Sequence, residues 1–490
     1  MSFNDLKYTF RRYQNFDFLW YLVGTMVPIL FNFIRNPIFT RHFTPEEYGY
    51  YSLVFLTYNY LSLIFYSWLG SIIWRYYYEY KNKNKLHELF SSLGSIYSAG
   101  SFILLVITII WYGNTELQLV KKIIVFSFFY YLLNDVTSFY LITIRLEKKV
   151  LEYNLLQSLR AIINFLVLCF FTFILNFRIE AIALSFFIST LLLIIYIIIS
   201  AYRNYKFIFL SISKLTKDTL GKIFRYGFTG LLVNAFALIL YNSDRYLIAL
   251  YHDINSVGIY NQNYIIAQTA ISAITMAFFN SISPDFNQCL TIDIKNSAIF
   301  ISRKMFNYII LLAPITFLIS LFAFEFNLFL LGQKFHHGYS IISYVAVSMF
   351  LFGWTTFSET KLKFANRLWT VIIGFSAACI INIALNLFFL RIYDYSLAAV
   401  TTLIAFAFLF VFFIIYDKES YLELVRSYYF ELIILICTIA LILFLNTWIK
   451  GYVLNYKRVI VSLIEFFIYS GILFTVIFFL LYKRNTITRK

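Results

Sequence analysis

The chain has 490 residues, of which 61% are hydrophobic and only 13% are charged, and its mean hydropathy is +0.76. This composition excludes an ordinary soluble protein, because a soluble core does not need apolar runs along the whole chain. The formal net charge is +16, but the basic residues are spread over many short loops, whereas nucleic-acid binding needs them gathered on one surface. We therefore expect an all-α integral membrane protein with no nucleic-acid partner.

Apolar runs long enough to cross a bilayer follow one another along the chain. A spanning helix needs about 20 predominantly apolar residues. The first six predicted helices cover about Asp17–Phe39, Gly49–Trp74, Leu89–Tyr112, Lys122–Ile144, Leu155–Phe177 and Ile179–Ala201. The next six cover about Tyr226–Tyr251, Gly258–Ser283, Phe306–Leu331, Gly338–Thr360, Leu368–Leu390 and Tyr395–Tyr416, and the last pair covers about Tyr429–Ile449 and Val459–Tyr482. The sequence thus predicts about fourteen transmembrane helices, with very short connections near Arg178 and Tyr393.

The orientation of these helices follows from the positions of Lys and Arg, because short cytoplasmic loops retain them. If the N-terminus is cytoplasmic, the cytoplasmic segments hold 28 of the 40 basic residues and the outer segments hold 9. The remaining three, Arg35, Arg160 and Arg245, lie within helices. The Lys450–Arg458 loop, with three basic residues on the predicted outer side, is the main exception. We predict that both termini are cytoplasmic.

The two halves of the chain share landmarks at an offset of 209 residues. Tyr48–Tyr51 opens the second helix and Val257–Tyr260 opens the eighth, while Arg35 falls within one residue of Arg245 at the same offset. Large transporters often consist of two such repeats, with the substrate bound at the repeat interface. We predict an N-lobe at residues 1–213, a C-lobe at residues 214–418 and an appended helix pair at residues 419–490.

Polar residues recur every three or four positions on four of the predicted helices, which places them on one face of each helix. These stripes are Thr25, Pro28, Asn32, Arg35 and Asn36; Ser52, Asn59, Ser62 and Tyr66; Gly230, Asn234, Tyr241 and Arg245; and Asn261, Gln268, Ser272 and Thr275. Small and hydroxyl residues also occur at ordinary helix–helix contacts in membranes. However, the richest stripes lie on equivalent helices of the two repeats, which favours a shared water-filled cleft.

Arginines inside the predicted helices are the strongest indication of a site, because a mid-bilayer Arg costs about 2.5–3.5 kcal/mol and rarely faces lipid. Arg35 and Arg245 fall in the outer half of the membrane. Arg245 could pair with Asp135 or Glu325, and Arg35 could reach the outer headgroups. Alternatively, both bind an anion, because a guanidinium matches phosphate oxygens bidentately and stays charged. Arg160 could be a first contact for substrate on the cytoplasmic side, or a headgroup anchor.

Acidic residues within the helices are candidates for ion coupling. Asp135 and Asp244 could carry a proton or help to bind sodium, although a structural salt bridge or packing contact would also explain them. No cofactor, catalytic residue or metal site is predicted. The predicted substrate-binding residues are Arg35, Arg245, Asn32, Asn234, Asn261, Gln268 and Arg160.

Four short segments resemble the polysaccharide-exporting branch of the MOP (multidrug/oligosaccharidyl-lipid/polysaccharide) flippase superfamily. They are Asp244–Ile248 (DRYLI), Val257–Tyr260 (VGIY), Arg225–Phe228 (RYGF) and Phe43–Gly49 (FTPEEYG). The resemblance covers the whole helix plan, and its motifs are moderately specific through their order and spacing. It implies two six-helix bundles in a V-shaped, MATE-like arrangement, with a cleft lined largely by helices one, two, seven and eight.

The resemblance also implies a function. A protein of this kind would translocate an undecaprenyl-pyrophosphate-linked oligosaccharide across the bacterial cytoplasmic (inner) membrane, with the pyrophosphate held by arginines in the cleft. The glycan would belong to an O-antigen, another lipopolysaccharide component or a capsule, and a polymerase and chain-length proteins would be partners. The chain has no P-loop spacing, so energy would come from an Na⁺ or H⁺ gradient or from consumption of the product.

Three other functions remain open at this point. A multidrug or cation exporter of the same fold should have a cleft dominated by acidic residues. A membrane glycan polymerase usually needs a large outer loop, whereas most outer loops here are shorter than about ten residues. A purely structural scaffold would not need buried charges, which are costly in a membrane.

Overall fold

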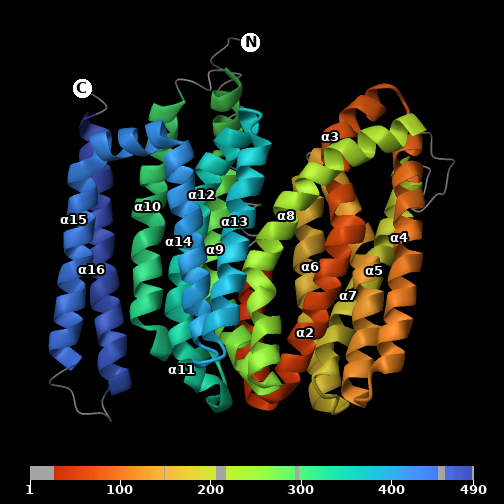
Figure 1. The fold of residues 1–490 in the computed structure, drawn as a ribbon, viewed down its shortest axis with the longest axis horizontal. Helices are drawn as coiled ribbons and strands as arrows, with labels where there is room; N and C mark the ends of the chain where they lie inside the picture. The colour runs from red at the N-terminus through yellow and green to blue at the C-terminus, as the bar shows by residue number, and fades with distance from the viewer. Residues whose placement is uncertain (1–26, 148, 206–216, 293–296, 451–457, 488–490) are drawn as a thin grey trace. The chain divides into compact units, whose positions relative to one another are not determined.

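The protein is described by a computed structural model that covers residues 27–147, 149–205, 217–292, 297–450 and 458–487 (Figure 1). Every regular element within these ranges is a helix. The first ten residues of the first predicted helix and the predicted lobe boundary at 213/214 lie outside the described residues. The division of the chain into lobes at that boundary therefore stays a prediction.

The chain forms two compact units, Met1–Tyr246 with Ile254–Gly258, and Leu247–Asp253 with Ile259–Lys490. The first unit begins with a helix described over residues 27–42. It continues with α2 (Pro45–Ser62), α3 (Trp68–Asn82), α4 (Leu86–Asn114), α5 (Gln118–Leu146), α6 (Val150–Cys169), α7 (Glu180–Tyr205) and most of α8 (Lys217–Tyr251). Within this unit α5 packs against α2, α3, α4, α6 and α7, and it is therefore the central helix.

The second unit contains most of α9 (Ile254–Ile292) and all later helices. These are α10 (Ala298–Leu321), α11 (Ala323–Leu330), α12 (Tyr339–Phe364), α13 (Leu368–Phe389), α14 (Leu397–Tyr416), α15 (Lys418–Lys450) and α16 (Arg458–Ile487), with a 3₁₀ turn η3 (Gln333–Gly338) before α12. Here α12 contacts α10, α11, α13 and α14. The appended pair α15 and α16 packs against α10, around a buried cluster of Phe322, Ile442, Tyr469 and Leu473.

The helices agree with the predicted plan. A helix occupies each of the fourteen predicted ranges in the described part of the chain, and breaks fall near Arg178 and Tyr393 as expected. Within the described residues, ten helical segments are long and apolar enough to cross a membrane by length and composition alone. The protein is therefore a multi-pass, all-α membrane protein, and the count of fourteen spans is approximate.

The start of α2 shows how the local sequence fixes a helix end. Pro45 occupies the first turn, where its missing N–H costs nothing. Thr44 and Glu47 form a capping box, in which the Glu47 carboxylate accepts from the Thr44 N–H at 2.9 Å and the Thr44 hydroxyl accepts from the Glu47 N–H at 3.3 Å. The FTPEEYG segment is thus a loop followed by a capped helix start.

Two glycines permit a close backbone crossing between the first turns of α2 and α9 within the first unit. A Cβ atom on Gly49 would lie 2.0 Å from the carbonyl oxygen of Ile254, and a Cβ on Gly258 would lie 1.8 Å from the carbonyl oxygen of Pro45. Neither distance is possible for a side chain, so only glycine fits at either position. The same two glycines are landmarks of the 209-residue offset.

Two helices contain a π-helical turn, η1 (Leu63–Ser67) between α2 and α3 and η2 (Phe170–Ile174) after α6. In η1, the Ser67 hydroxyl donates to the Ser62 carbonyl at 3.3 Å and the Trp68 indole donates to the Ile64 carbonyl at 3.0 Å. Side chains that bond to main-chain carbonyls in this way disturb the regular helical ladder, and π turns frequently lie at functional sites. The sequence does not predict either turn.

Candidate functional site

A cavity of about 180 Å³ lies inside the first unit, between the first described helix, α6 and α7. This volume is well above the roughly 10–15 Å³ that one water needs. Its lining residues are Pro28, Phe31, Asn32, Arg35, Gln157, Arg160, Ala161, Asn164, Phe165, Phe186 and Ser189. Among the described residues, the cavity wall therefore combines two arginines, three amides, one hydroxyl and three aromatic rings, with no carboxylate.

Arg35 reaches this cavity from the first described helix. Its guanidinium carbon lies 5.5 Å from the centre of the Phe186 ring, and its Nη1 atom is buried without a hydrogen-bond partner in the described part of the chain. No ion pair of Arg35 occurs among the described residues. The alternative in which Arg35 reaches outward to headgroups does not fit this inward position.

Arg160 is held near the middle of the helix bundle. Its Nη2 atom donates to the Asn134 side-chain oxygen on α5 at 2.7 Å and to the Thr190 hydroxyl on α7 at 2.9 Å. Both acceptors are neutral, so the guanidinium keeps its full charge. Nη2 has used both of its hydrogens, while Nε and Nη1 remain for other partners. The alternative of a headgroup anchor does not fit these contacts.

Asp135 is buried beside this site, one residue after Asn134 on α5, and only 6% of its surface is exposed. Its two carboxylate oxygens accept from the Ser62 hydroxyl at 3.1 and 2.9 Å. Ser62 is the last residue of α2 before the π-helical turn η1. Asp135 forms no ion pair with Arg245 among the described residues, so that alternative for Arg245 is wrong.

The other predicted residues lie elsewhere. Asp244 and Arg245 are buried on α8, with 0% and 3% of their surfaces exposed, and Arg245 donates to the Tyr241 carbonyl. Asn234, on the same helix, is exposed. Glu325, the second predicted partner of Arg245, lies on α11 in the other unit, so this alternative stays a prediction. Neither Arg245 nor Asn234 lines the cavity.

Two predicted residues belong to the second unit. Asn261 on α9 is buried and Gln268 is half-buried. The predicted cleft between the lobes, to which both residues were assigned, stays a prediction.

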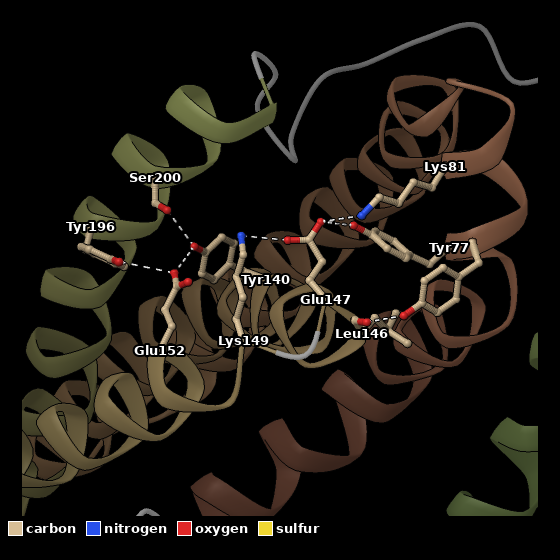
Figure 2. Close-up of polar contacts among 10 residues, drawn as sticks. Tyr77, Lys81, Tyr140, Leu146, Glu147, Lys149, Glu152, Tyr196 and Ser200 are labelled. Atoms are coloured by element: carbon tan, nitrogen blue, oxygen red, sulfur yellow. Dashed lines mark hydrogen bonds and ion pairs between the residues drawn. The ribbon is translucent and has the colours of Figure 1, made fainter. Parts of the chain in front are cut away.

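A polar network joins the ends of the helices that carry the cavity residues (Figure 2). The Tyr140 hydroxyl on α5 lies 2.7 Å from the Glu152 carboxylate on α6 and 2.8 Å from the Ser200 hydroxyl on α7. Glu147 accepts hydrogen bonds from Tyr77 at 2.6 Å and from Lys81 at 3.0 Å, both on α3. These bonds fix α3, α5, α6 and α7 relative to one another at the predicted cytoplasmic end.

Most of the cavity lining on α6 and α7 is not among the predicted residues. Gln157, Arg160 and Asn164 follow one another at spacings of three and four, so they form a polar stripe on one face of α6. The same spacing of three or four residues marks the four polar stripes predicted on the other helices. Phe186 and Ser189 carry no such signal, because they lie in an apolar run and only the fold brings them to the cavity.

Comparison with known proteins gives the family. Residues 16–290, more than half of the chain, match the family described as "Polysaccharide biosynthesis protein". The chain belongs to this family. No curated protein sequence matches the chain.

Solved structures give the fold. The lipid II flippase MurJ in an inward closed conformation matches with a TM-score of 0.66 and 14% identity, over 96% of this chain and 100% of that chain. A point mutant of the Vibrio cholerae MATE transporter VcmN matches with a TM-score of 0.53 and 12% identity, over 83% of this chain and 97% of that chain. A MATE protein in the straight conformation matches with a TM-score of 0.52 and 12% identity, over 84% and 94% of the two chains.

These matches confirm two of the predictions. The chain is a member of a polysaccharide biosynthesis family, and its fold class is that of MurJ and the MATE proteins.

Proposed function

We propose that this protein translocates an undecaprenyl-pyrophosphate-linked oligosaccharide across the bacterial cytoplasmic membrane, and that Arg35 and Arg160 bind the pyrophosphate. The cavity with two arginines and no carboxylate is the observation that carries the proposal. The family match supports a substrate from polysaccharide biosynthesis. Arg160, predicted as a first contact for substrate, lines the same cavity as Arg35.

The donors in the cavity favour an anion. Nη1 of Arg35 is buried without a hydrogen-bond partner within the described ranges, and Arg160 has N–H groups beyond the two of Nη2 that bond to Asn134 and Thr190. A buried donor without a partner costs about 1–3 kcal/mol, and more when it is charged. A phosphate oxygen satisfies such donors with short, charge-assisted hydrogen bonds. Binding of an anionic ligand would therefore remove the free-energy cost of leaving these N–H donors without acceptors.

The rest of the lining suits the neighbouring parts of such a substrate. Asn32, Gln157, Asn164 and Ser189 can exchange hydrogen bonds with hydroxyl groups of a sugar. The polyprenyl chain would stay in the lipid while the polar head crosses, and the two lobes would open alternately to the two sides of the membrane. Arg245, Asn234, Asn261 and Gln268 would then contact the substrate from the remainder of the passage.

Ion coupling belongs to the same proposal. Asp135 would carry H⁺ or Na⁺, and its neighbour Asn134 would connect it to Arg160. Asp244, buried beside Arg245, is the second candidate. The substrate would be supplied by enzymes that build the glycan on its lipid carrier, and it would be consumed by a polymerase on the outer side.

A cation exporter of the same fold is disfavoured by the charge of the cavity. Such a protein needs acidic residues where its substrate binds, whereas the described lining is positive. The proposal therefore takes an anionic head group as the cargo.

The decisive experiment measures flipping of a fluorescent polyprenyl-pyrophosphate oligosaccharide in proteoliposomes. We expect Arg35→Ala and Arg160→Ala each to lower the initial rate by at least about tenfold, since each removes a desolvated charge–phosphate contact worth more than about 1.4 kcal/mol. Arg→Lys at either position should retain part of the rate, because the charge stays but the bidentate fork is lost.

Arg75→Ala is the matched control. Arg75 is an exposed arginine on α3, outside the cavity, and its guanidinium lies over the Tyr76 ring at 5.5 Å. This variant should flip at the wild-type rate. Unchanged flipping by both cavity variants, with normal folding, would refute the proposed anion site.

A further inference from the structure

The two cavity arginines are linked by a pair of aromatic rings. The Arg35 guanidinium lies over Phe186 on α7 at 5.5 Å, and the Arg160 guanidinium lies over Tyr130 on α5 at 5.8 Å. The Phe186 and Tyr130 rings contact each other, with their centres 5.2 Å apart. The order of contacts is therefore guanidinium, ring, ring, guanidinium.

This arrangement is unusual for two positive charges that face one cavity. Like charges repel, and a protein usually fixes a buried arginine with a carboxylate partner. A carboxylate would hold the side chain in place but would also compete with an anionic ligand. The face of an aromatic ring attracts a cation within about 6 Å through its quadrupole and leaves the N–H donors free. A ring thus positions a guanidinium without neutralising it.

Arg35 depends on this contact more than Arg160 does. Arg160 is also held by Asn134 and Thr190. The Arg35 guanidinium lies over the Phe186 ring, and its other recorded interactions are electrostatic, with the tyrosine hydroxyls of Tyr48, Tyr51 and Tyr130. Phe186 is itself fixed by Tyr130 and by Phe55 on α2, whose ring centre is 5.7 Å away. The contacts between these two rings therefore set the position of the Arg35 guanidinium relative to that of Arg160.

We propose that Phe186 and Tyr130 are positioning residues that set the spacing of Arg35 and Arg160, so that the cavity prefers a diphosphate to a monophosphate. The inference rests on the proposed function, because it assumes that the cavity binds phosphate groups. A diphosphate offers two phosphoryl groups joined through one oxygen, and each can meet one guanidinium fork. A monophosphate meets both forks only at a shorter spacing. The ring pair thereby distinguishes a lipid diphosphate from the lipid monophosphate carrier.

The test measures the affinities of the purified full-length protein for inorganic pyrophosphate and for inorganic phosphate at constant ionic strength. Wild-type protein should bind pyrophosphate more tightly than phosphate. Phe186→Leu keeps an apolar side chain but removes the ring face, and it should weaken pyrophosphate binding about 2- to 30-fold, the range that corresponds to a lost cation–π contact. Phosphate binding should change little, so the ratio of the two affinities should fall.

Phe187→Leu is the matched control on the same helix. Its ring contacts Phe129 at 5.5 Å and does not line the cavity, so the affinity ratio should stay at the wild-type value. Phe186→Tyr retains a ring and should restore the ratio. Tyr130→Leu removes the other ring of the pair and tests the inference if Phe186→Leu does not fold. Tyr130→Phe keeps the ring and removes only the hydroxyl that interacts with Arg160, so the affinity ratio should stay above that of Tyr130→Leu.

The outcomes separate the two proposals. If wild type prefers pyrophosphate and both leucine variants keep that preference, the ring pair has no positioning role, but the anion site stands. If wild type binds neither anion, the anion site fails and this inference fails with it. A general loss of stability would reduce the bound fraction for both anions, without changing the ratio of their dissociation constants.

Discussion

Arg35 and Arg160 keep their charge inside a membrane protein by different means. Arg160 uses neutral acceptors on two neighbouring helices, whereas Arg35 has an aromatic face and otherwise unused donors. Both residues were predictable as site candidates from the sequence, because an arginine within an apolar run is recognisable whichever face of the helix carries it. The sequence could not show that they share a cavity, since that depends on how three helices pack. The role of Arg245 on the second repeat stays a prediction, because it does not line this cavity and the predicted cleft between the lobes is not tested.

Asp135 gives a prediction at the residue scale. Asp135→Asn keeps the shape and can still bond to Ser62, but it cannot exchange a proton or neutralise a sodium ion. We expect this variant to flip substrate at a rate that no longer responds to an imposed pH or Na⁺ gradient across the proteoliposome membrane. Ser62→Ala should keep the response, because the carboxylate remains. An unaltered gradient response in Asp135→Asn would remove the coupling role.

At the scale of elements, the helix plan was predictable and its details were not. Runs of about 20 apolar residues identify spans whatever their surroundings, and the FTPEEYG segment carries its own capping signal. The π turns η1 and η2 were not predictable from the apolar runs in which they lie. In η1, the side chains of Ser67 and Trp68 bond to main-chain carbonyls of the preceding turn, a contact that the sequence does not reveal. The polar stripe of Gln157, Arg160 and Asn164 on α6 is recognisable in the sequence from its spacing of three and four residues.

The crossing of α2 and α9 gives a prediction for the elements. Gly49→Ala and Gly258→Ala each place a Cβ about 2 Å from a main-chain carbonyl oxygen, so the two helix starts must separate. We expect both variants to unfold at lower temperature and to give less folded protein in fluorescence-detected size-exclusion chromatography. Gly113→Ala is the matched control, since its Cβ would meet nothing within 4 Å. In a helix, that change should be neutral or slightly stabilising.

For the whole molecule, the sequence predicts which side of the membrane each loop faces. The family and the fold establish a multi-pass membrane protein, and the charge bias predicts cytoplasmic termini. The arrangement of the two lobes could not be derived, because repeat spacing says nothing about the angle between them.

Orientation is tested by single cysteines in a variant that lacks the four native ones. A cysteine at Asn84, in the turn between α3 and α4, should react with a membrane-impermeant maleimide only after the cells are opened. A cysteine at Glu116, between α4 and α5, should react in intact spheroplasts. The opposite pattern would invert the orientation and the direction of transport that we propose.

The contact between the starts of α2 and α9 also bears on how the chain arose. The offset of 209 residues relates Pro45 to Ile254 and Gly49 to Gly258, so the two tight approaches, Gly49 to Ile254 and Gly258 to Pro45, are one contact made twice. Reciprocity of this kind is the mark of an isologous dimer. If the two halves derive from a half-length ancestor, a single codon specified both glycines, and a mutation there altered both sides of the interface at once. A later gene fusion would have separated the two codons, and the present chain holds glycine at both positions.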